Sequence, residues 1–545
     1  MPQSPGADGM AQAGRRLGSI QQVSIMTRTL LILAASAATL VVVVALLFID
    51  DSSRRAAIQS NGSPADGAGP APLMVYCAAS NRAVLEAIRR DYVEETGREV
   101  QIQYGPSQTL LSQIQVGGIG DLYLPADDSF LQLARDQGLV EEILPIAHMQ
   151  AVVVVAAGNP LQIATLDDLL AERVRLVQAN PEAAAIAKLV KEEFSRQGLW
   201  ERVDRATDAY RTTVTDVVND VVVGAADAGI VYDAVLHPFS GVGQVELPEL
   251  SRVRSRVAVG VLKSSRDPAA ALHFARYISA VDRGLQRYRE HGFRVGQGDR
   301  WADVPELTIY AGSMLRPAIE DTITAFERRE GVRVTRVYNG CGILVGQMKG
   351  GHHPDAYFAC DAEFMNQVAD LFSTPVPVTQ NELVILVQKG NPHRIASLRD
   401  LARPGLRVGI GHEKQCAMGW LTQLTFEQGG VRSEVMPNVT VQTPTGDMLV
   451  NQLLTGSLDA AVAYLSNAVG AGDRLDAIRI EGIPCAVATQ PWAVAKDSPY
   501  PAMAQRLFER IRSVESRQEF EANGFRWTLG SESETASEPV SSGSP

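Results

Sequence analysis

Residues 74–110 read MVYCAASNRAVLEAIRRDYVEETGREVQIQYGPSQTL, and a related stretch, TIYAGSMLRPAIEDTITAFERREGVRVTRVYNGCGIL, follows at residues 308–344. Four tyrosine and aspartate anchors match at a constant separation of 234 positions: Tyr76 with Tyr310, Tyr104 with Tyr338, Asp121 with Asp355, and Asp127 with Asp361. Later anchors match at a separation of 232 positions: Asn159 with Asn391, Tyr232 with Tyr464, and Gly292 with Gly524. A period this long is that of a whole domain rather than of a solenoid unit. The sequence therefore predicts one domain duplicated in tandem.

The composition is that of a folded globular protein with an acidic surface. The 545 residues are 46% hydrophobic and 21% charged, with a net charge of −12, and a chain of this length holds about two to four domains. The negative charge argues against nucleic acid, which requires a basic face. It is compatible with a small anion, because backbone N–H groups at helix N-termini bind anions without side-chain charge. Five cysteines in so long a chain do not make a disulfide scaffold.

The N-terminal region predicts a membrane anchor. Residues 29–49, TLLILAASAATLVVVVALLFI, carry no charge and are long enough to cross a bilayer as a helix. A cleaved signal peptide is the alternative, but its apolar region is shorter. Arginines in the preceding tail, 1–28, and the acidic Asp50-Asp51 after the span place the N-terminus in the cytoplasm. We therefore expect a single-pass inner-membrane protein with the bulk of the chain in the periplasm.

Polar segments delimit the two copies. Residues 50–71 are rich in small residues, Pro and Gly, which predicts a flexible linker, and residues 531–545 have the composition of a disordered tail. The first module is predicted at 72–300 and the second at 305–530.

Within each copy, strand and helix patterns alternate. After the strand LMVYCA comes a helical pattern that ends at Gly97, with its apolar residues on one face: Val84, Leu85, Ile88 and Tyr92. The run MQAVVVVAAG is typical of a strand buried on both faces. The alternation predicts an α/β fold with a largely parallel sheet.

The order of short motifs resembles that of a known family. The motifs are Y-G-x-S-x-x-L at 104–110, G-D-L-Y-x-x-A-D at 120–127, A-V-V-V-V with N-P at 151–160, D-A-G-I-V-Y at 227–232, and a closing G-F at 292–293. Together they resemble the periplasmic molybdate-binding proteins of ABC importers, which are type II solute-binding proteins. The resemblance implies that each module has two α/β lobes joined by a hinge. It also implies capture of a small oxyanion, of the molybdate or tungstate class, and delivery to an ABC permease.

A tetrahedral oxyanion presents only acceptors, so its site requires hydroxyl and backbone N–H donors. Ser80 and Ser107 each stand between a strand and a helix. Ser80 is either a ligand contact or a helix cap, and both roles can coexist. By resemblance, Ser107 is the second binding serine, backbone N–H groups near Ala184 and Val214 contact the ligand, and Tyr232 donates its hydroxyl. A buried core tyrosine is the alternative for Tyr232.

The second copy departs from this pattern. Its candidate ligand-binding residues are Ser313, Cys341, Ala417, Gly446 and Tyr464. In register with Ser80 stands Met314, one position after Ser313, while Cys341 replaces Ser107. A thiol is a poorer hydrogen-bond donor than a hydroxyl but a better soft-metal ligand and nucleophile.

The cysteines of the second copy leave three interpretations open. Cys341 and Cys416 form a disulfide or redox pair, or provide a soft-ligand site with His412 or Glu413, or are inert small residues in an altered cage. Cys360 and Cys485 are predicted to lie in strands as buried structural thiols.

Catalytic motifs are missing from the sequence. It contains no G-x-S-x-G, no phosphate-binding P-loop and no H-E-x-x-H. We therefore expect no enzyme activity, no cofactor and no resident metal.

The sequence predicts a membrane-anchored solute-binding protein for ABC import. The alternative is a membrane-anchored receptor or protein-binding scaffold whose second site is altered.

Overall fold

The computed structural model describes residues 71–530. The predicted cytoplasmic tail, anchor and C-terminal tail lie outside these residues, as does nearly all of the predicted linker. Within the described range, no helix has the length and apolar character needed to cross a membrane. Residues 72–530 belong to one compact unit.

The two copies have the same sheet topology. The strand order is β2-β1-β3-β9-β4-β7-β5-β6 in the first sheet and β12-β11-β13-β19-β14-β17-β15-β16 in the second. In each sheet two short strands pair with the long central strand, β8 and β10 with β4 and β18 and β20 with β14. The duplication read from the sequence is thus a duplication of the whole fold.

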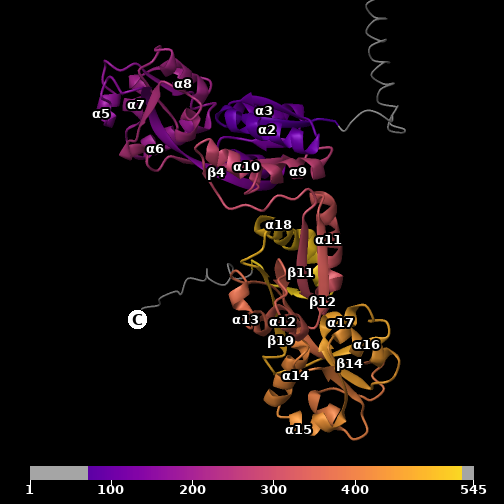
Figure 1. Ribbon diagram of the computed structural model, residues 1–545. Coiled ribbons are helices and arrows are strands. Elements are labelled where there is room, and N and C mark those ends of the chain that lie inside the picture. Colours follow the sequence, from indigo (N-terminus) through magenta and orange to yellow (C-terminus); the bar gives the residue numbers. More distant parts are fainter. Residues whose placement is uncertain (1–70, 531–545) are drawn as a thin grey trace, which may run out of the picture. The chain divides into compact units, whose positions relative to one another are not determined.

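The first module consists of two α/β lobes, and β4 runs from one to the other (Figure 1). The first lobe contains β1 (Leu73–Ala78), α2 (Arg82–Thr96), β2 (Val100–Gly105), α3 (Ser107–Gly117), β3 (Leu122–Leu124), α4 (Ser129–Asp136), β9 (Arg254–Leu262), α9 (Pro268–Ser279), α10 (Gly284–Glu290) and β10 (Arg294–Val295). The long strand and the second lobe contain β4 (Val140–Ala156), α5 (Leu166–Leu169), β5 (Leu176–Ala179), α6 (Ala185–Arg196), α7 (Trp200–Ala206), β6 (Thr207–Arg211), α8 (Val214–Val222), β7 (Ala228–Tyr232) and β8 (Val242–Val245).

The second module repeats this arrangement. Its first lobe contains β11 (Glu306–Gly312), α11 (Arg316–Glu330), β12 (Arg333–Asn339), α12 (Cys341–Lys349), β13 (Ala356–Phe358), α13 (Ala362–Asn366), β19 (Val487–Val494), α18 (Pro501–Ile511), α19 (Val514–Ala522) and β20 (Arg526–Trp527). The long strand and second lobe contain β14 (Val376–Gln388), β15 (Val408–Gly411), α14 (Ala417–Gln428), α15 (Arg432–Val435), β16 (Val439–Thr443), α16 (Gly446–Leu454), β17 (Ala460–Tyr464), α17 (Leu465–Val469) and β18 (Leu475–Arg479).

The sheets are mixed, which corrects the prediction of a largely parallel sheet. Strand β4, which contains the predicted apolar run, is antiparallel to β7, β8, β9 and β10. Only the pairs β1 with β2 and β3, and β5 with β6 and β7, are parallel in the first module. A strand buried between helices on both faces has the same continuous apolar pattern in either orientation, so the pattern does not report direction.

Some of the repeated anchor residues have local roles that the backbone explains. Asn159 and Asn391 both have positive φ, 48° and 46°. In the first copy the Asn159 side chain bonds the backbone of Ile163 twice, at 2.8 and 3.0 Å. Asn391 bonds Ile395 in the same way, at 2.8 and 2.9 Å. Asparagine is among the residues that adopt positive φ most readily, so the turn after each long strand selects it.

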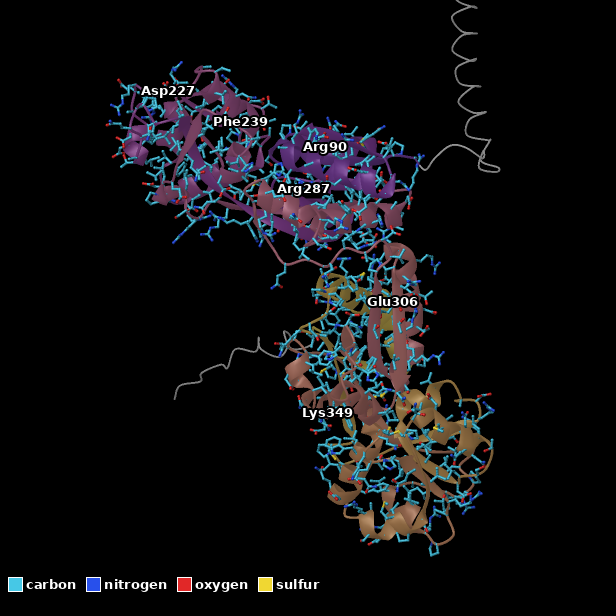
Figure 2. The ribbon with its side chains drawn as sticks, in the orientation of Figure 1. Arg90, Asp227, Phe239, Arg287, Glu306 and Lys349 are labelled. Atoms are coloured by element: carbon cyan, nitrogen blue, oxygen red, sulfur yellow. The ribbon has the colours of Figure 1, made fainter. Side chains whose placement is uncertain are left out.

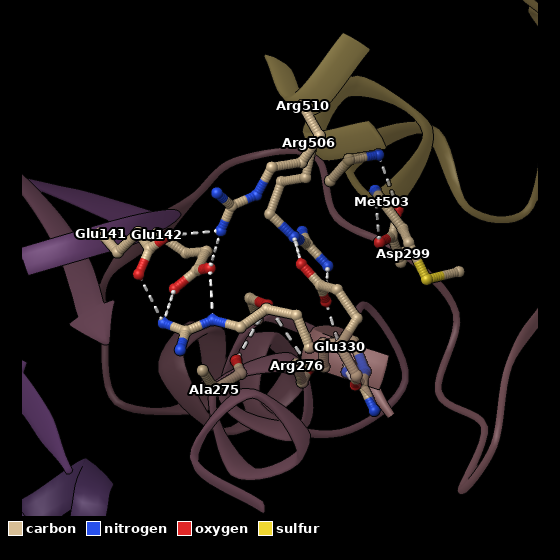
Figure 3. A network of polar contacts seen from close by, with 12 residues as sticks. Glu141, Glu142, Ala275, Arg276, Asp299, Glu330, Met503, Arg506 and Arg510 are labelled. Atoms are coloured by element: carbon tan, nitrogen blue, oxygen red, sulfur yellow. Dashed lines mark hydrogen bonds and ion pairs between the residues drawn. The ribbon is translucent and has the colours of Figure 1, made fainter. Parts of the chain in front are cut away.

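Buried ion pairs join the two modules (Figure 3). Arg506 of α18 donates to both carboxylate oxygens of Glu330 at 2.7 and 3.0 Å, and Arg276 of α9 donates to the same carboxylate at 3.4 Å. Arg329 makes a bidentate contact with Glu142 of β4 at 2.9 and 3.0 Å. Burial would raise the pKa of Glu330, but the two guanidinium groups hold it below its ordinary value. The carboxylate of Glu330 is therefore charged and shared by both modules.

Candidate functional site

The five residues predicted as ligand contacts in the first module lie around one small pocket. The cavity measures about 20 Å³. Its lining includes Ser80, Ser107, Ala184, Val214 and Tyr232, together with Ala78, Ala126 and Thr213. These residues come from both lobes, at strand ends and at helix starts. A cavity of this volume has room for about one water-sized group and none for an extended organic molecule.

Helix N-termini from both lobes open onto this pocket. Ser107 is the first residue of α3, and Ala184 directly precedes α6. Neither helix has a side-chain cap, so the positive end of each dipole is left for another acceptor. Val214 begins α8, whose N-cap Thr213 accepts a hydrogen bond from Asp216. Three helix starts around one cavity favour an anionic ligand.

The two serines differ in their local role. Ser107 Oγ accepts a hydrogen bond from the N–H of Ala126 at 3.0 Å, which leaves its own hydrogen free to be donated. Ser80 lies in a 3-10 turn before α2 and does not cap that helix, because its N-cap is Asn81 and no side chain caps it. The Ser80 hydroxyl accepts from the Asn81 amide at 3.3 Å. Both hydroxyls therefore retain a hydrogen for a ligand.

Tyr232 lies at the end of β7 and is 1% exposed. Its hydroxyl has no hydrogen-bond partner of normal geometry among the described residues. The Ser255 hydroxyl, which lies close enough to lower the Tyr232 pKa, donates to the carbonyl of Ala126. Burial raises the pKa of Tyr232 well above its ordinary value, so the phenol stays protonated. A buried donor without a partner is costly unless something supplies an acceptor. Tyr232 is thus a donor that lacks an acceptor beside the pocket.

The two lobes are in contact across each cleft. In the first module the N–H of Gln108 donates to the carbonyl of Ala183 at 3.2 Å. The corresponding bond in the second module joins Gly342 to Gln415 at 3.1 Å. Both modules are therefore described in a closed form.

In the second module sulfur replaces oxygen or carbon at several wall positions. Cys341 begins α12 as Ser107 begins α3, and Met314 occupies the place of Ser80 in the preceding 3-10 turn. Ser313 stands one position earlier, where the first module has Ala79. Cys416 precedes α14 as Ala184 precedes α6, so the predicted contact Ala417 is one residue further into the helix.

The remaining predicted residues of the second cleft are Gly446 and Tyr464. Gly446 begins α16 as Val214 begins α8, and a Cβ there would stand 2.2 Å from Asn467 Oδ1. Tyr464, at the end of β17, is 2% exposed, and its hydroxyl has no partner among the described residues. The unpartnered buried phenol is thus common to both modules.

Cys360 was not recognised as a site residue from the sequence. It occupies the position of Ala126 and follows β13 rather than lying in a strand, so that prediction was wrong. Its Sγ lies 2.7 Å from Cys341 Sγ. Cys485 is also outside any strand and only partly buried. The constant separation of 234 positions that links Asp127 to Asp361 also links Ala126 to Cys360, and this was the available signal.

A wider groove of about 760 Å³ is lined by residues next in sequence to the first pocket, including Gln108 and Ala183. Two lysines and two glutamates line it as well, and Lys191 pairs with Glu182 at 3.3 Å; the other two are Lys188 and Glu192. The second module has Trp420 and Gln423 at the helix positions of Lys188 and Lys191. The two lysines therefore have no counterpart at the same positions of the second module.

Residues 71–530 contain no group of three or more His, Cys, Asp or Glu side chains arranged to hold a metal ion. The adjacent His352 and His353 are exposed, and His353 lies 3.2 Å from Asp497.

Comparison with known proteins gives the same assignment for both modules. The model of the family described as bacterial extracellular solute-binding protein matches residues 73–294 and again 307–526. A binding protein of Haemophilus influenzae is 27% identical over 223 residues, which are 40% of this chain and 90% of that protein. The molybdate-binding protein ModA of Mycobacterium bovis is 26% identical over 223 residues, covering 40% of this chain and 84% of its own length.

Among solved structures, the periplasmic molybdate-binding protein of Azotobacter vinelandii is similar over 41% of this chain and all of its own, with 19% identity and a TM-score of 0.37. Relatives of this kind are binding proteins rather than enzymes. Because the family model covers both modules and most of the sequence, the chain belongs to the bacterial extracellular solute-binding proteins.

Proposed function

We propose that the first module captures a small tetrahedral oxyanion of the molybdate or tungstate class. The observation that carries the proposal is the buried, unpartnered hydroxyl of Tyr232 in a pocket lined by Ser80 and Ser107. Every donor in this pocket is neutral, since no lysine or arginine lines it. Hydroxyl and backbone donors suit a dianion and release it more readily than fixed cations would.

Binding acts through closure of the two lobes. Ser80 and Ser107 belong to the first lobe, whereas Ala184, Val214 and Tyr232 belong to the second. An anion that accepts from both sets stabilises the closed form and shifts the population toward it.

In the cell, the chain acts at the outer face of the inner membrane. We propose that residues 29–49 anchor it and that residues 50–71 tether the modules beside an ABC permease, which receives the ion. The molybdate-binding relatives support this class of ligand.

A second candidate function is a membrane-anchored receptor or scaffold. The observation that favours it is the second cleft, where Met314 and Cys341 replace the two serines. Two non-equivalent clefts in one chain suit the comparison of two signals better than the delivery of one ion.

Isothermal calorimetry with molybdate, tungstate, sulfate and phosphate on the periplasmic part tests the proposal. We expect one molybdate or tungstate per chain and a higher unfolding temperature with the ion present, because a ligand of the folded state stabilises it. Binding of none of these ions would refute it, and a partner protein retained in their absence would favour the scaffold. Two equivalent molybdate sites per chain would contradict the proposal that only the first module binds the oxyanion.

A further inference from the structure

Two thiols meet in the wall of the second cleft. Cys341 Sγ and Cys360 Sγ are 2.7 Å apart, and the N–H of Cys360 also donates to Cys341 Sγ at 3.0 Å. The first module has Ser107 accepting from the N–H of Ala126 at the same two positions. The backbone contact is thus common to both modules, and the second module has added a sulfur at each end of it.

The second module also provides the room for this pair. A Cβ built on Gly312 would stand 2.1 Å from Cys360 Sγ and 3.3 Å from Cys341 Sγ. The residue at this position in the first module is Ala78, which lines the first pocket together with Ala126. The larger side chain at 360 is therefore matched by a smaller one at 312. The second module thus differs from the first at three neighbouring positions, which hold Cys341, Cys360 and Gly312. Together these differences accommodate a pair of thiols, which a single cysteine substitution would not explain.

The two thiols are chemically unequal. Burial acts to raise the pKa of Cys341, but the hydrogen bonds from the thiol and N–H of Cys360 bring it below its ordinary value. Donation to Cys341 and burial raise the pKa of Cys360. Cys341 also begins α12, whose N-terminus favours a thiolate. Figure 2 marks the other end of this helix at Lys349.

We propose that Cys341 and Cys360 are a reversible dithiol–disulfide pair that modifies the second cleft. The Cys341 thiolate attacks one sulfur of an external disulfide, forms a mixed disulfide and releases one thiolate. Cys360 then loses its proton to that thiolate, and its sulfur attacks Cys341 Sγ and expels the second thiolate, which takes up the proton lost by Cys341. The two cysteines are oxidised by two electrons, and the external disulfide is reduced to two thiols.

The position of the pair makes its oxidation depend on the separation of the two lobes. Cys341 is 0% and Cys360 5% exposed. Next to Cys341, a Cβ on Gly340 would stand 2.4 Å from the carbonyl oxygens of Gln415 and Pro444 of the other lobe. An external disulfide therefore reaches the pair only when the lobes separate. Oxidation changes the wall of the second cleft and leaves the first cleft as it is.

Peptide mapping of the full chain tests the proposal. The chain is equilibrated in reduced and oxidised glutathione, quenched with acid, alkylated and digested. We expect oxidation to remove two of the five free thiols and to yield a peptide cross-linked between Cys341 and Cys360. A cross-link from Cys341 to Cys416, or five free thiols in fully oxidised buffer, would overturn it.

Variants that carry first-module residues separate chemistry from folding. Cys341→Ser and Cys360→Ala install the residues found at these positions in the first module, so each should fold and lose the cross-link, whereas Cys416→Ser should keep it. Gly312→Ala should reduce cross-linking and lower the unfolding midpoint, because the added Cβ would clash with Cys360 Sγ. Adding Cys360→Ala removes this clash and should restore the midpoint. Oxidation should raise the unfolding midpoint of the unmodified chain but not that of Cys360→Ala. Cross-linking that persists unchanged in Gly312→Ala would contradict the packing on which the proposal rests.

Discussion

The two clefts of this protein have the same backbone but different chemistry. Both place a helix start after the second strand, a cross-lobe backbone bond and a buried unpartnered tyrosine in the same positions. The first lines its wall with hydroxyls from Ser80 and Ser107, whereas the second carries Met314 and Cys341. A duplicated fold therefore preserves the hydrogen-bond frame that holds the lobes, while the side chains that face the cleft diverge.

The largest expected effect comes from removing the donors of the first cleft. Ser107→Ala with Tyr232→Phe should weaken molybdate binding by about 1–3 kcal/mol for each hydrogen bond to the charged ligand. Calorimetry measures this loss, and Tyr464→Phe in the second module is the matched control that should leave molybdate binding unchanged. An unchanged molybdate affinity in the double variant would show that Ser107 and Tyr232 do not contact the ligand.

The next effect tests the buried carboxylate of Glu330, which pairs with Arg506 of its own module and with Arg276 of the first module. Glu330→Gln removes a carboxylate that is 1% exposed and faces Arg506 and Arg276. We expect a loss of about 3–5 kcal/mol in the free energy of unfolding, because two buried guanidinium groups lose their partner. Denaturant unfolding measures it.

The control for that experiment is Glu521→Gln, which breaks the exposed pair with Arg517 and should cost less than about 1 kcal/mol. Equal losses in the two variants would show that the buried Glu330 cluster contributes no more to stability than an exposed ion pair.

A pH effect should distinguish the second module. Burial raises the pKa of Asp361 to about 6. The folded state thus holds this proton more tightly than the unfolded chain, so stability falls as pH rises from about 4 to 6, by about 2–3 kcal/mol from this group. Asp361→Asn should remove that decline and stabilise the chain near neutral pH. Denaturant unfolding across this range checks it, and an unchanged pH slope in the variant would refute the assignment to Asp361.

The smallest effect is a single-atom exchange that makes the first cleft resemble the second. Ser107→Cys keeps the helix start and the backbone bond but replaces a hydroxyl donor by a weaker thiol. We expect a loss of about 1 kcal/mol, which is about fivefold in affinity for molybdate. Calorimetry near neutral pH keeps the ligand tetrahedral and the thiol mostly protonated, and a gain in affinity would show that the thiol in the second cleft is no obstacle to an oxyanion.

The sequence determined much of the first cleft, because its signals are local or periodic. Ser107, Val214 and Tyr232 each stand at a strand end or helix start, and such positions in an α/β module gather at one edge of the sheet. The structure places all five predicted residues on one pocket. Their role toward a ligand is still a prediction. Strand direction was misjudged, because an apolar run buried on both faces is the same in parallel and antiparallel sheets.

The sequence by itself determined the duplication, the α/β class and the replacement of serine by cysteine at position 341, since each is read from spacing and residue type. Only the tertiary structure decided which thiol Cys341 meets. The sequence offered Cys416 as a partner for Cys341. In the structure Cys360 lies beside Cys341 instead, in the space left by Gly312. A contact of this kind depends on where the ends of separate strands come together in space. Neither periodicity nor motif order contains that information.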